Sequence, residues 1–246
     1  MPRVNRSIII LVALFVVYGF LGQVNQAGGL DPALRALRFT LLFVVPSFLI
    51  GIVLHEFAHA AVATWRGDPT PKALGRLTLN PLKHLDPLGT AMIFLAGFVW
   101  ANPVPISPQY FRNPKRDLAL AAGAGPAMNV TITVLSIVAI NAFVPAYERD
   151  PLALARGSAL FTFLLTLAQI NALLAVFNLI PIPPLDGSHF MRVILSPRAY
   201  FTYHQNQLLL SAFGFVLLLA GFFDPLFKAV QMKVAELCLT QYWGVN

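Results

Sequence analysis

The chain has 246 residues, of which 57% are hydrophobic and 11% are charged, and its mean hydropathy is +0.71. Soluble domains have roughly 45–50% apolar and about 25% charged residues, so this composition excludes a water-soluble globule and a disordered chain. Its 17 basic and 10 acidic residues give a net charge of +7. Because no Lys- and Arg-rich run alternates with aromatic residues, this excess indicates a membrane surface rather than nucleic acid. We therefore expect an all-α polytopic membrane protein.

Long apolar runs predict about six transmembrane helices. In chain order they cover about residues 8–24, 39–64, 118–144, 158–180, 207–223 and 226–240. The first run follows two arginines, as in a signal peptide, but no small-x-small cleavage site follows it, so an uncleaved helix is favoured. The last run carries three charged residues and is expected to lie partly at the interface. It contains Cys238, the single cysteine, which is expected to be a small core residue.

The apolar stretch 88–100 has only 13 residues, whereas a helix needs about 20 to cross the hydrocarbon core. We therefore predict that it is re-entrant or interfacial. The segments on one side of the membrane then hold 11 Lys and Arg residues and those on the other side hold four. The positive-inside rule places the richer side, with both termini, in the cytoplasm. We expect a single membrane-embedded domain over residues 1–246, with peripheral helices at about 8–24, 207–223 and 226–240.

Three ionisable residues lie within the second apolar run, in the sequence His55-Glu56-Phe57-Ala58-His59. On a helix, residues i and i+4 lie on one face, so the two imidazoles can bind one metal ion. Glu56 is placed to act as a general base on a water at a Zn²⁺ ion. The alternative is a pair of core histidines that are hydrogen-bonded to neighbouring helices. It does not explain three costly polar residues on one face at membrane depth.

Two histidines and a water leave a tetrahedral zinc site one protein ligand short. Asp186 is the clear candidate, because it follows the fourth predicted helix, which ends on the same side of the membrane as the second. The prolines at 181, 183 and 184 end that helix and require extended backbone. Gly187 is expected to permit a tight turn after the ligand. The alternative is that this segment is an interfacial turn.

Three motifs together resemble the site-2 protease family of intramembrane zinc metalloproteases. They are the sequences His55–His59, Gly125-Pro-Ala-Met-Asn129 and Asn178-Leu-Ile-Pro-Ile-Pro-Pro-Leu-Asp186-Gly187. The resemblance covers about residues 39–187, the expected catalytic core. It implies one Zn²⁺ ion held by His55, His59 and Asp186, with Glu56 as the catalytic residue. It also implies that Asn129 and Asn178 position substrate or backbone near the metal.

The sequences at 79–89 and 102–108 resemble compact prokaryotic members of the family, which lack PDZ and CBS domains. Gly187-Ser188-His189 departs from the Gly-Gly-Arg sequence that many members have after the aspartate. His189 is therefore a candidate gating residue, although an interfacial polar group is the more common role. His84 is a candidate accessory ligand, although a solvated loop residue is more common. Gly123 and Gly125 predict close helix packing.

The resemblance implies hydrolysis of a peptide bond within or near a transmembrane segment of a membrane-protein substrate. The expected partners are that substrate and the lipid bilayer, in a prokaryotic inner membrane with the active site towards the cytoplasm. The substrate has to unwind, and extended segments such as 102–108 or 181–184 are candidates to pair with it. The alternative function is a membrane metal-binding or transport protein that uses the same ligands without hydrolysis. The sequence leaves the oligomeric state open.

Overall fold

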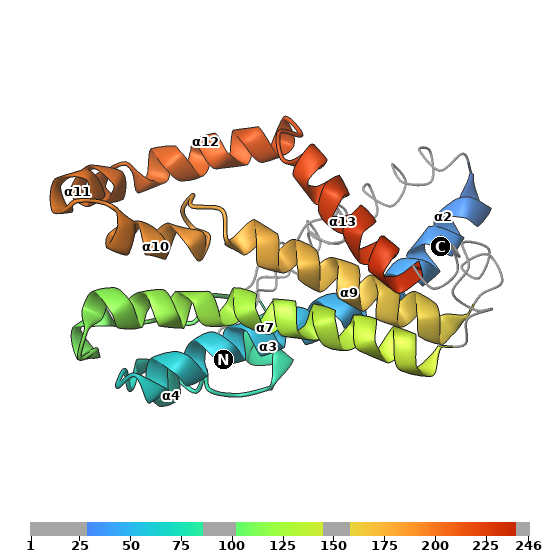
Figure 1. The fold of residues 1–246 in the computed structure, drawn as a ribbon, viewed down its shortest axis with the longest axis horizontal. Helices are drawn as coiled ribbons and strands as arrows, with labels where there is room; N and C mark the ends of the chain where they lie inside the picture. The colour runs from blue at the N-terminus through green and yellow to red at the C-terminus, as the bar shows by residue number, and fades with distance from the viewer. Residues whose placement is uncertain (1–28, 86–101, 145–157, 240–246) are drawn as a thin grey trace, which may run out of the picture.

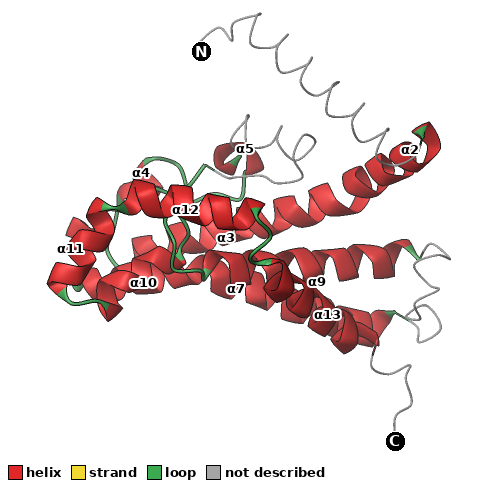
Figure 2. Ribbon diagram, turned by 90° about the horizontal axis from the view of Figure 1, so that it is seen from above, coloured by secondary structure: helices red, strands yellow, loops and turns green. Residues whose placement is uncertain are grey.

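The structure is a computed structural model, and it describes residues 29–85, 102–144 and 158–239. The helix expected at 8–24 and the re-entrant segment expected at 88–100 lie outside these ranges. The described ranges consist of helices joined by loops and short turns, as Figure 1 and Figure 2 show from two directions. The all-α class is therefore confirmed.

The elements follow one another along the chain with their labels as in Figure 1. They are α2 (Leu30–Phe39), the π-helical turn η1 (Thr40–Val44), α3 (Val45–Trp65), α4 (Thr70–Ala73), α5 (Pro81–His84), the 3-10 turn η2 (Pro108–Tyr110), α7 (Pro114–Phe143), α9 (Ala159–Asn178), α10 (Gly187–Ile194), α11 (Pro197–Gln205), α12 (Gln207–Leu219) and α13 (Asp224–Leu239).

Three helical segments are long and apolar enough to cross a membrane. They are the continuous helix Leu30–Trp65, which joins α2, η1 and α3, together with α7 and α9. The first begins about nine residues before the predicted start at 39. The π-helical turn inside it precedes Pro46, whose missing N–H cannot continue a regular hydrogen-bond ladder. The spans predicted at 118–144 and 158–180 match α7 and α9 within a few residues.

The helices predicted at 207–223 and 226–240 form one bent pair instead of two independent spans. The axes of α12 and α13 differ by 64°, and the chain turns at Gly221, whose φ is +71°. With 13 residues, α12 is about 20 Å long, shorter than a hydrocarbon core of about 30 Å. The described residues therefore provide three spans, or four if α12 and α13 cross together, and the predicted count of six is not confirmed.

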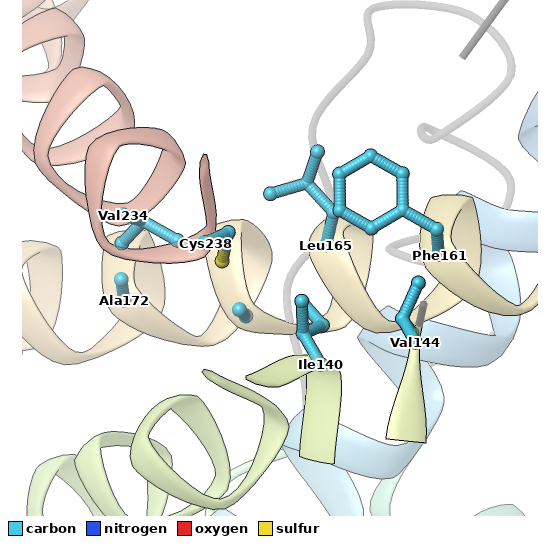
Figure 3. Close-up of a cluster of buried hydrophobic side chains, with 8 residues drawn as sticks. Ile140, Val144, Phe161, Leu165, Ala172, Val234 and Cys238 are labelled. Carbon is cyan, nitrogen blue, oxygen red and sulfur yellow. The ribbon is translucent and has the colours of Figure 1, made fainter. Parts of the chain in front are cut away.

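The three spans pack on one another to form the centre of the molecule. In Figure 1, α7 lies along both α3 and α9, and α13 rests on α9. Figure 3 shows a buried apolar cluster where the end of α7 and the start of α9 meet α13; Ile140, Phe161 and Cys238 belong to it. Cys238 is 1% exposed and is a core residue, as predicted. This cluster fixes one end of the helix bundle and leaves the other end for polar residues.

At the opposite end, an ion pair joins the end of α3 to the start of α7. The guanidinium of Arg66 donates from Nε to Asp117 Oδ1 at 2.8 Å and also approaches it through Nη2 at 2.5 Å. Asp117 also accepts a bond from the backbone N–H of Asn113, the N-cap residue of α7. The ion pair fixes how far α3 is displaced along α7, and this sets the register of the side chains between them.

Candidate metal centre

Two histidines of α3 and one aspartate from the loop before α10 converge at the polar end of the bundle. The Nε2 atoms of His55 and His59 are 2.9 Å apart. The Oδ2 atom of Asp186 lies 3.1 Å from His55 Nε2 and 3.2 Å from His59 Nε2. Among the described residues, these three form a group able to hold a metal ion. Asp186 is the N-cap residue of α10, but its side chain makes no capping bond and turns to the imidazoles instead.

The loop that carries Asp186 is held tightly against the end of α9. A Cβ atom on Gly187 would lie 2.4 Å from the carbonyl oxygen of Leu179, so only glycine fits this position. The tight turn predicted after Asp186 is present, because the N–H of Ser188 donates to the Leu185 carbonyl and the N–H of His189 to the Asp186 carbonyl, each at 3.0 Å. Gly187 also permits the close backbone approach at the start of α10. From α11, the Tyr203 hydroxyl donates to the Pro181 carbonyl at 3.0 Å. Burial raises the pKa of Tyr203, which keeps the donating proton on the phenol.

Each histidine uses its Nδ1 atom to bind α7. His59 Nδ1 donates to the backbone carbonyl of Ala121 at 2.7 Å, and His55 Nδ1 lies 2.5 Å from Asn129 Oδ1. A carbonyl oxygen only accepts, so the proton of a neutral His59 is on Nδ1 and the lone pair is on Nε2. Acceptors behind Nδ1 are the usual means by which proteins orient metal-binding histidines.

A chain of hydrogen bonds through side-chain amides determines which nitrogen of His55 carries the proton. The Asn171 amide donates from Nδ2 to the Leu167 carbonyl at 2.9 Å, which leaves its Oδ1 as the acceptor for Asn129 Nδ2, also at 2.9 Å. Asn129 Oδ1 therefore faces His55 as an acceptor, and His55 Nε2 carries the lone pair. Asn129 and Asn171 are both fully buried. A backbone carbonyl of α9 thus sets the tautomer of a histidine on α3.

Three electron-pair donors within about 3 Å of one another repel unless a cation lies among them. The backbone of α7 lies directly against two of these donors. A Cβ atom on Gly125 would lie 2.3 Å from His59 Nε2 and 2.6 Å from His55 Nε2. Gly125 allows α7 to pack closely on α3, as predicted, and the α3 groups that it faces are the two imidazoles. Gly123, its neighbour on α7, packs instead on Phe190 of α10.

Glu56 lies beside the ligands and is 6% exposed. Its Oε2 atom accepts a hydrogen bond of 3.0 Å from the backbone N–H of Val104. The extended segment 102–107 is fixed by two further amides, because Asn102 N–H donates to the His84 carbonyl at 2.8 Å and Ser107 N–H donates to Asp68 at 2.7 Å. The segment therefore uses most of its donors to hold Glu56 and its own position, and has few left to pair with a substrate strand.

A cavity of about 380 Å³ opens beside the candidate metal ligands. Glu56, His59 and Asp186 lie in its wall, together with Val104 of the extended segment and Tyr203 of α11. It is large enough to admit an extended piece of polypeptide to the ligands and to Glu56.

Comparison with known proteins identifies the family. The sequence model described as peptidase family M50 matches residues 43–221. The chain belongs to peptidase family M50, the site-2 protease family. It is 38% identical to YwhC of Bacillus subtilis (strain 168), named as a zinc metalloprotease, over 75% of this chain and 81% of the relative. It is 31% identical to Rip2 of Mycobacterium tuberculosis (strain H37Rv), named likewise, over 94% of both chains. No solved structure matches the chain significantly.

The M50 match makes this chain an integral-membrane zinc metalloprotease, and the donor set suits zinc. Two imidazole nitrogens and one carboxylate oxygen are ligands that zinc commonly takes, with the fourth position open in catalytic sites. Tetrahedral bonds of about 2.0–2.1 Å separate ligand atoms by about 3.3 Å. The three separations here are 2.9, 3.1 and 3.2 Å.

The remaining candidate residues of this M50 protein are outside the group that could hold the metal. Asn178 donates to the Leu174 carbonyl in its own helix at 2.9 Å and is outside the cavity wall. His189 lies in that wall, outside the metal-ligand group. His84 is fully buried, in contrast to the solvated loop residue expected, and its Nε2 bonds to the Thr78 carbonyl at 2.8 Å. Asn171 was missed as a site residue, although a buried amide in an apolar helix was a usable signal.

Proposed function

We propose that this protein hydrolyses peptide bonds within or beside a transmembrane segment of a membrane-protein substrate. His55, His59 and Asp186 hold the zinc ion, and Glu56 is the general base. The observation that carries the proposal is the convergence of His55, His59 and Asp186 into one group beside a cavity that Glu56 also lines. Both histidines lie on a helix of membrane-spanning length. His59 is six residues from the end of that helix, about 9 Å along its axis, so the site lies at membrane depth near one surface.

The zinc ion and the surrounding residues have separate roles in the proposed reaction. Bound zinc supplies the Lewis acidity that polarises the scissile carbonyl and acidifies the attacking water. The Val104 N–H occupies Oε2 of Glu56, so proton transfer falls to Oε1. Glu56 takes the proton of the attacking water and then delivers it to the leaving amine nitrogen as the C–N bond breaks. Ala121 and Asn129 hold the imidazoles so that their Nε2 lone pairs face Asp186.

Charge supports a cytoplasmic location of the site in a prokaryotic inner membrane. The end of the bundle where α3 ends and α7 begins is rich in Lys and Arg, and cytoplasmic surfaces carry this excess. The residues concerned are Arg66, Lys72, Arg76, Lys83, Arg112, Lys115, Arg116, Arg192 and Arg198. Leu74, at the end of α4 and close after the end of α3, is 59% exposed, whereas Cys238 is buried. In Leu74→Cys protein, an impermeant maleimide should label inverted vesicles and spare right-side-out ones; the reverse pattern would contradict a cytoplasmic site.

The alternative, a metal transporter, is not favoured. Transport needs further polar groups along a pathway, but Asn129 and Asn171 are both used in the amide chain behind His55.

The decisive experiment combines zinc analysis with cleavage of a single-span substrate by purified protein in liposomes. The wild type is expected to hold one zinc ion and cleave the substrate within or next to its apolar segment. Glu56→Gln should retain zinc and lose cleavage, because an amide cannot accept the proton of water. Undiminished cleavage by Glu56→Gln, or cleavage confined to soluble regions of the substrate, would refute the proposal.

A further inference from the structure

A second cavity, of about 240 Å³, lies against the loop that carries Asp186. Its walls come from the end of α9, the loop itself and the inner face of α12, and they are almost entirely apolar. Ser211 of α12 is the polar side chain in the wall, and its hydroxyl donates to the Gln207 carbonyl of its own helix at 2.8 Å. The cavity therefore offers an occupant contact with apolar atoms.

This second cavity is next to the catalytic cavity. Pro183 and Pro184 line both of them. The two prolines thus form a thin wall, with the catalytic cavity on one side and apolar space on the other. A polypeptide in the catalytic cavity would therefore lie next to the apolar space, with these two residues between them.

The shared wall cannot recognise a substrate backbone by donating hydrogen bonds. Pro183 and Pro184 have no N–H group. The amide of Ile182 donates to the Ile180 carbonyl at 2.8 Å, and the amide of Leu185 donates to the Ile182 carbonyl at 3.0 Å. The strand pairing considered for 181–184 therefore lacks donors on the protein side. What this wall presents to an occupant is the apolar surface of its side chains.

Helix α12 is fitted closely to the loop. A Cβ atom on Gly214 would lie 2.6 Å from Cγ2 of Ile182, so glycine lets the helix backbone rest directly on that side chain. This contact fixes Phe215 and Leu218, on the same part of α12, as the outer wall of the cavity. The cavity is thus built by a specific contact between two segments that are distant in sequence.

We propose that this cavity, the apolar subsite, binds one large apolar side chain of the substrate next to the scissile bond. It is defined by Phe177, Ile182, Pro183, Pro184, Gly214 and Leu218. The inference rests on the proposed function and adds a substrate preference to it. A transmembrane segment supplies mainly Leu, Ile, Val and Phe side chains, and their transfer into such a pocket is favourable in proportion to the apolar surface buried. The adjoining catalytic cavity argues for a substrate side chain, rather than a lipid chain, as the occupant.

The test varies both the pocket and the substrate. Single-span substrates carry Ala, Leu or Phe at each of the four positions on either side of the cleaved bond, and kcat/KM is measured in liposomes. Leu218→Trp fills the subsite. Leu219→Trp is the matched control, because Leu219 is the next residue of α12, is 69% exposed and lies outside the cavity wall.

The wild type is expected to prefer Leu or Phe over Ala at one position by about tenfold or more, since one apolar side chain distinguishes substrates by this order of magnitude. Leu218→Trp should abolish that preference through loss of activity on the large side chains, with cleavage of the Ala substrate kept within about twofold. Leu219→Trp should keep the wild-type preference.

Equal loss on all substrates in Leu218→Trp, or a preserved preference, would overturn the subsite while leaving the proposed protease function intact. Preserved preference together with displacement of a co-purified lipid would assign the cavity to lipid. Failure of the zinc-loaded wild type to cleave any substrate would instead refute the proposed function, and the subsite with it.

Discussion

Asn129 accepts a hydrogen bond of 2.5 Å from Nδ1 of His55, and this bond connects α7 to the metal-binding face of α3. It is the middle of a chain that continues through Asn171 to the Leu167 carbonyl of α9. All three central helices therefore contribute to the orientation of one imidazole. The chain holds the lone pair of His55 Nε2 towards Asp186 and the metal position.

We predict that Asn129→Leu lowers zinc affinity by about 10–100-fold, the usual cost of removing the partner of a ligating histidine. Asn171→Leu should lower it less, because Asn129 then keeps its place but not its fixed amide orientation. Since Asn171 acts through Asn129, the double variant should match Asn129→Leu alone. Zinc competition titration measures these affinities, with Thr131→Ala, an exposed change on α7, as the control. Additive effects in the double variant would contradict the chain.

Gly125→Ala should remove zinc binding and lower activity by more than about 100-fold. The added methyl group would occupy space 2.3 Å from His59 Nε2 and so displace the imidazoles. Alanine is favoured over glycine within a helix by about 1 kcal/mol, so the loss should occur in folded protein. Gly123→Ala is the matched control, because its Cβ would meet Phe190 at 3.3 Å and that side chain can move slightly. Circular dichroism and zinc analysis are the measurements, and full zinc content in Gly125→Ala would be incompatible with the geometry.

Val104→Pro should lower kcat by about 10–100-fold with zinc retained. The substitution removes the N–H that fixes Oε2 of Glu56, and a general base contributes about 10²–10⁴-fold to the rate when it is well positioned. Val104→Ala keeps the N–H and should stay close to the wild type. Equal loss of activity in both variants would contradict the prediction and assign the effect to the Val104 side chain instead of its N–H group.

Removal of zinc with a chelator should abolish cleavage while leaving the helices folded, because the buried clusters of the bundle do not include the metal ligands. Adding Zn²⁺ back should restore activity and raise the melting temperature, since a ligand present at 100 times its Kd stabilises the native state by about 2.7 kcal/mol. Activity that persists after zinc is measured as absent would contradict the proposed mechanism.

The long apolar runs of the sequence were sufficient to predict α7 and α9, because the thickness of the bilayer sets the length of a membrane-spanning helix. They were insufficient at α12 and α13, where the bend at Gly221 turns two predicted helices into one bent pair. Hydropathy records whether a residue can face lipid, but it carries no information on the angle between consecutive helices. The described residues therefore provide three or four spans, and the predicted count of six is not confirmed.

The roles of small residues also required the structure. Gly125 and Gly187 were both noticed in the sequence, one for helix packing and the other for a turn. Gly125 faces the imidazoles of His55 and His59, which are at least 66 residues away in the sequence. Gly187 faces the Leu179 carbonyl, which is eight residues away. A glycine shows that space is needed, but only the folded chain shows which group uses that space.

The sequence by itself determined the solvent of this protein and the chemical nature of its site. Composition requires a membrane, and the scarcity of charge within apolar runs makes His55, Glu56, His59 and Asp186 conspicuous. The tertiary structure decided how these groups are oriented. Tautomers, ligand separations and the apolar subsite depend on contacts between helices, and such contacts are set by packing geometry that no local pattern of residues encodes.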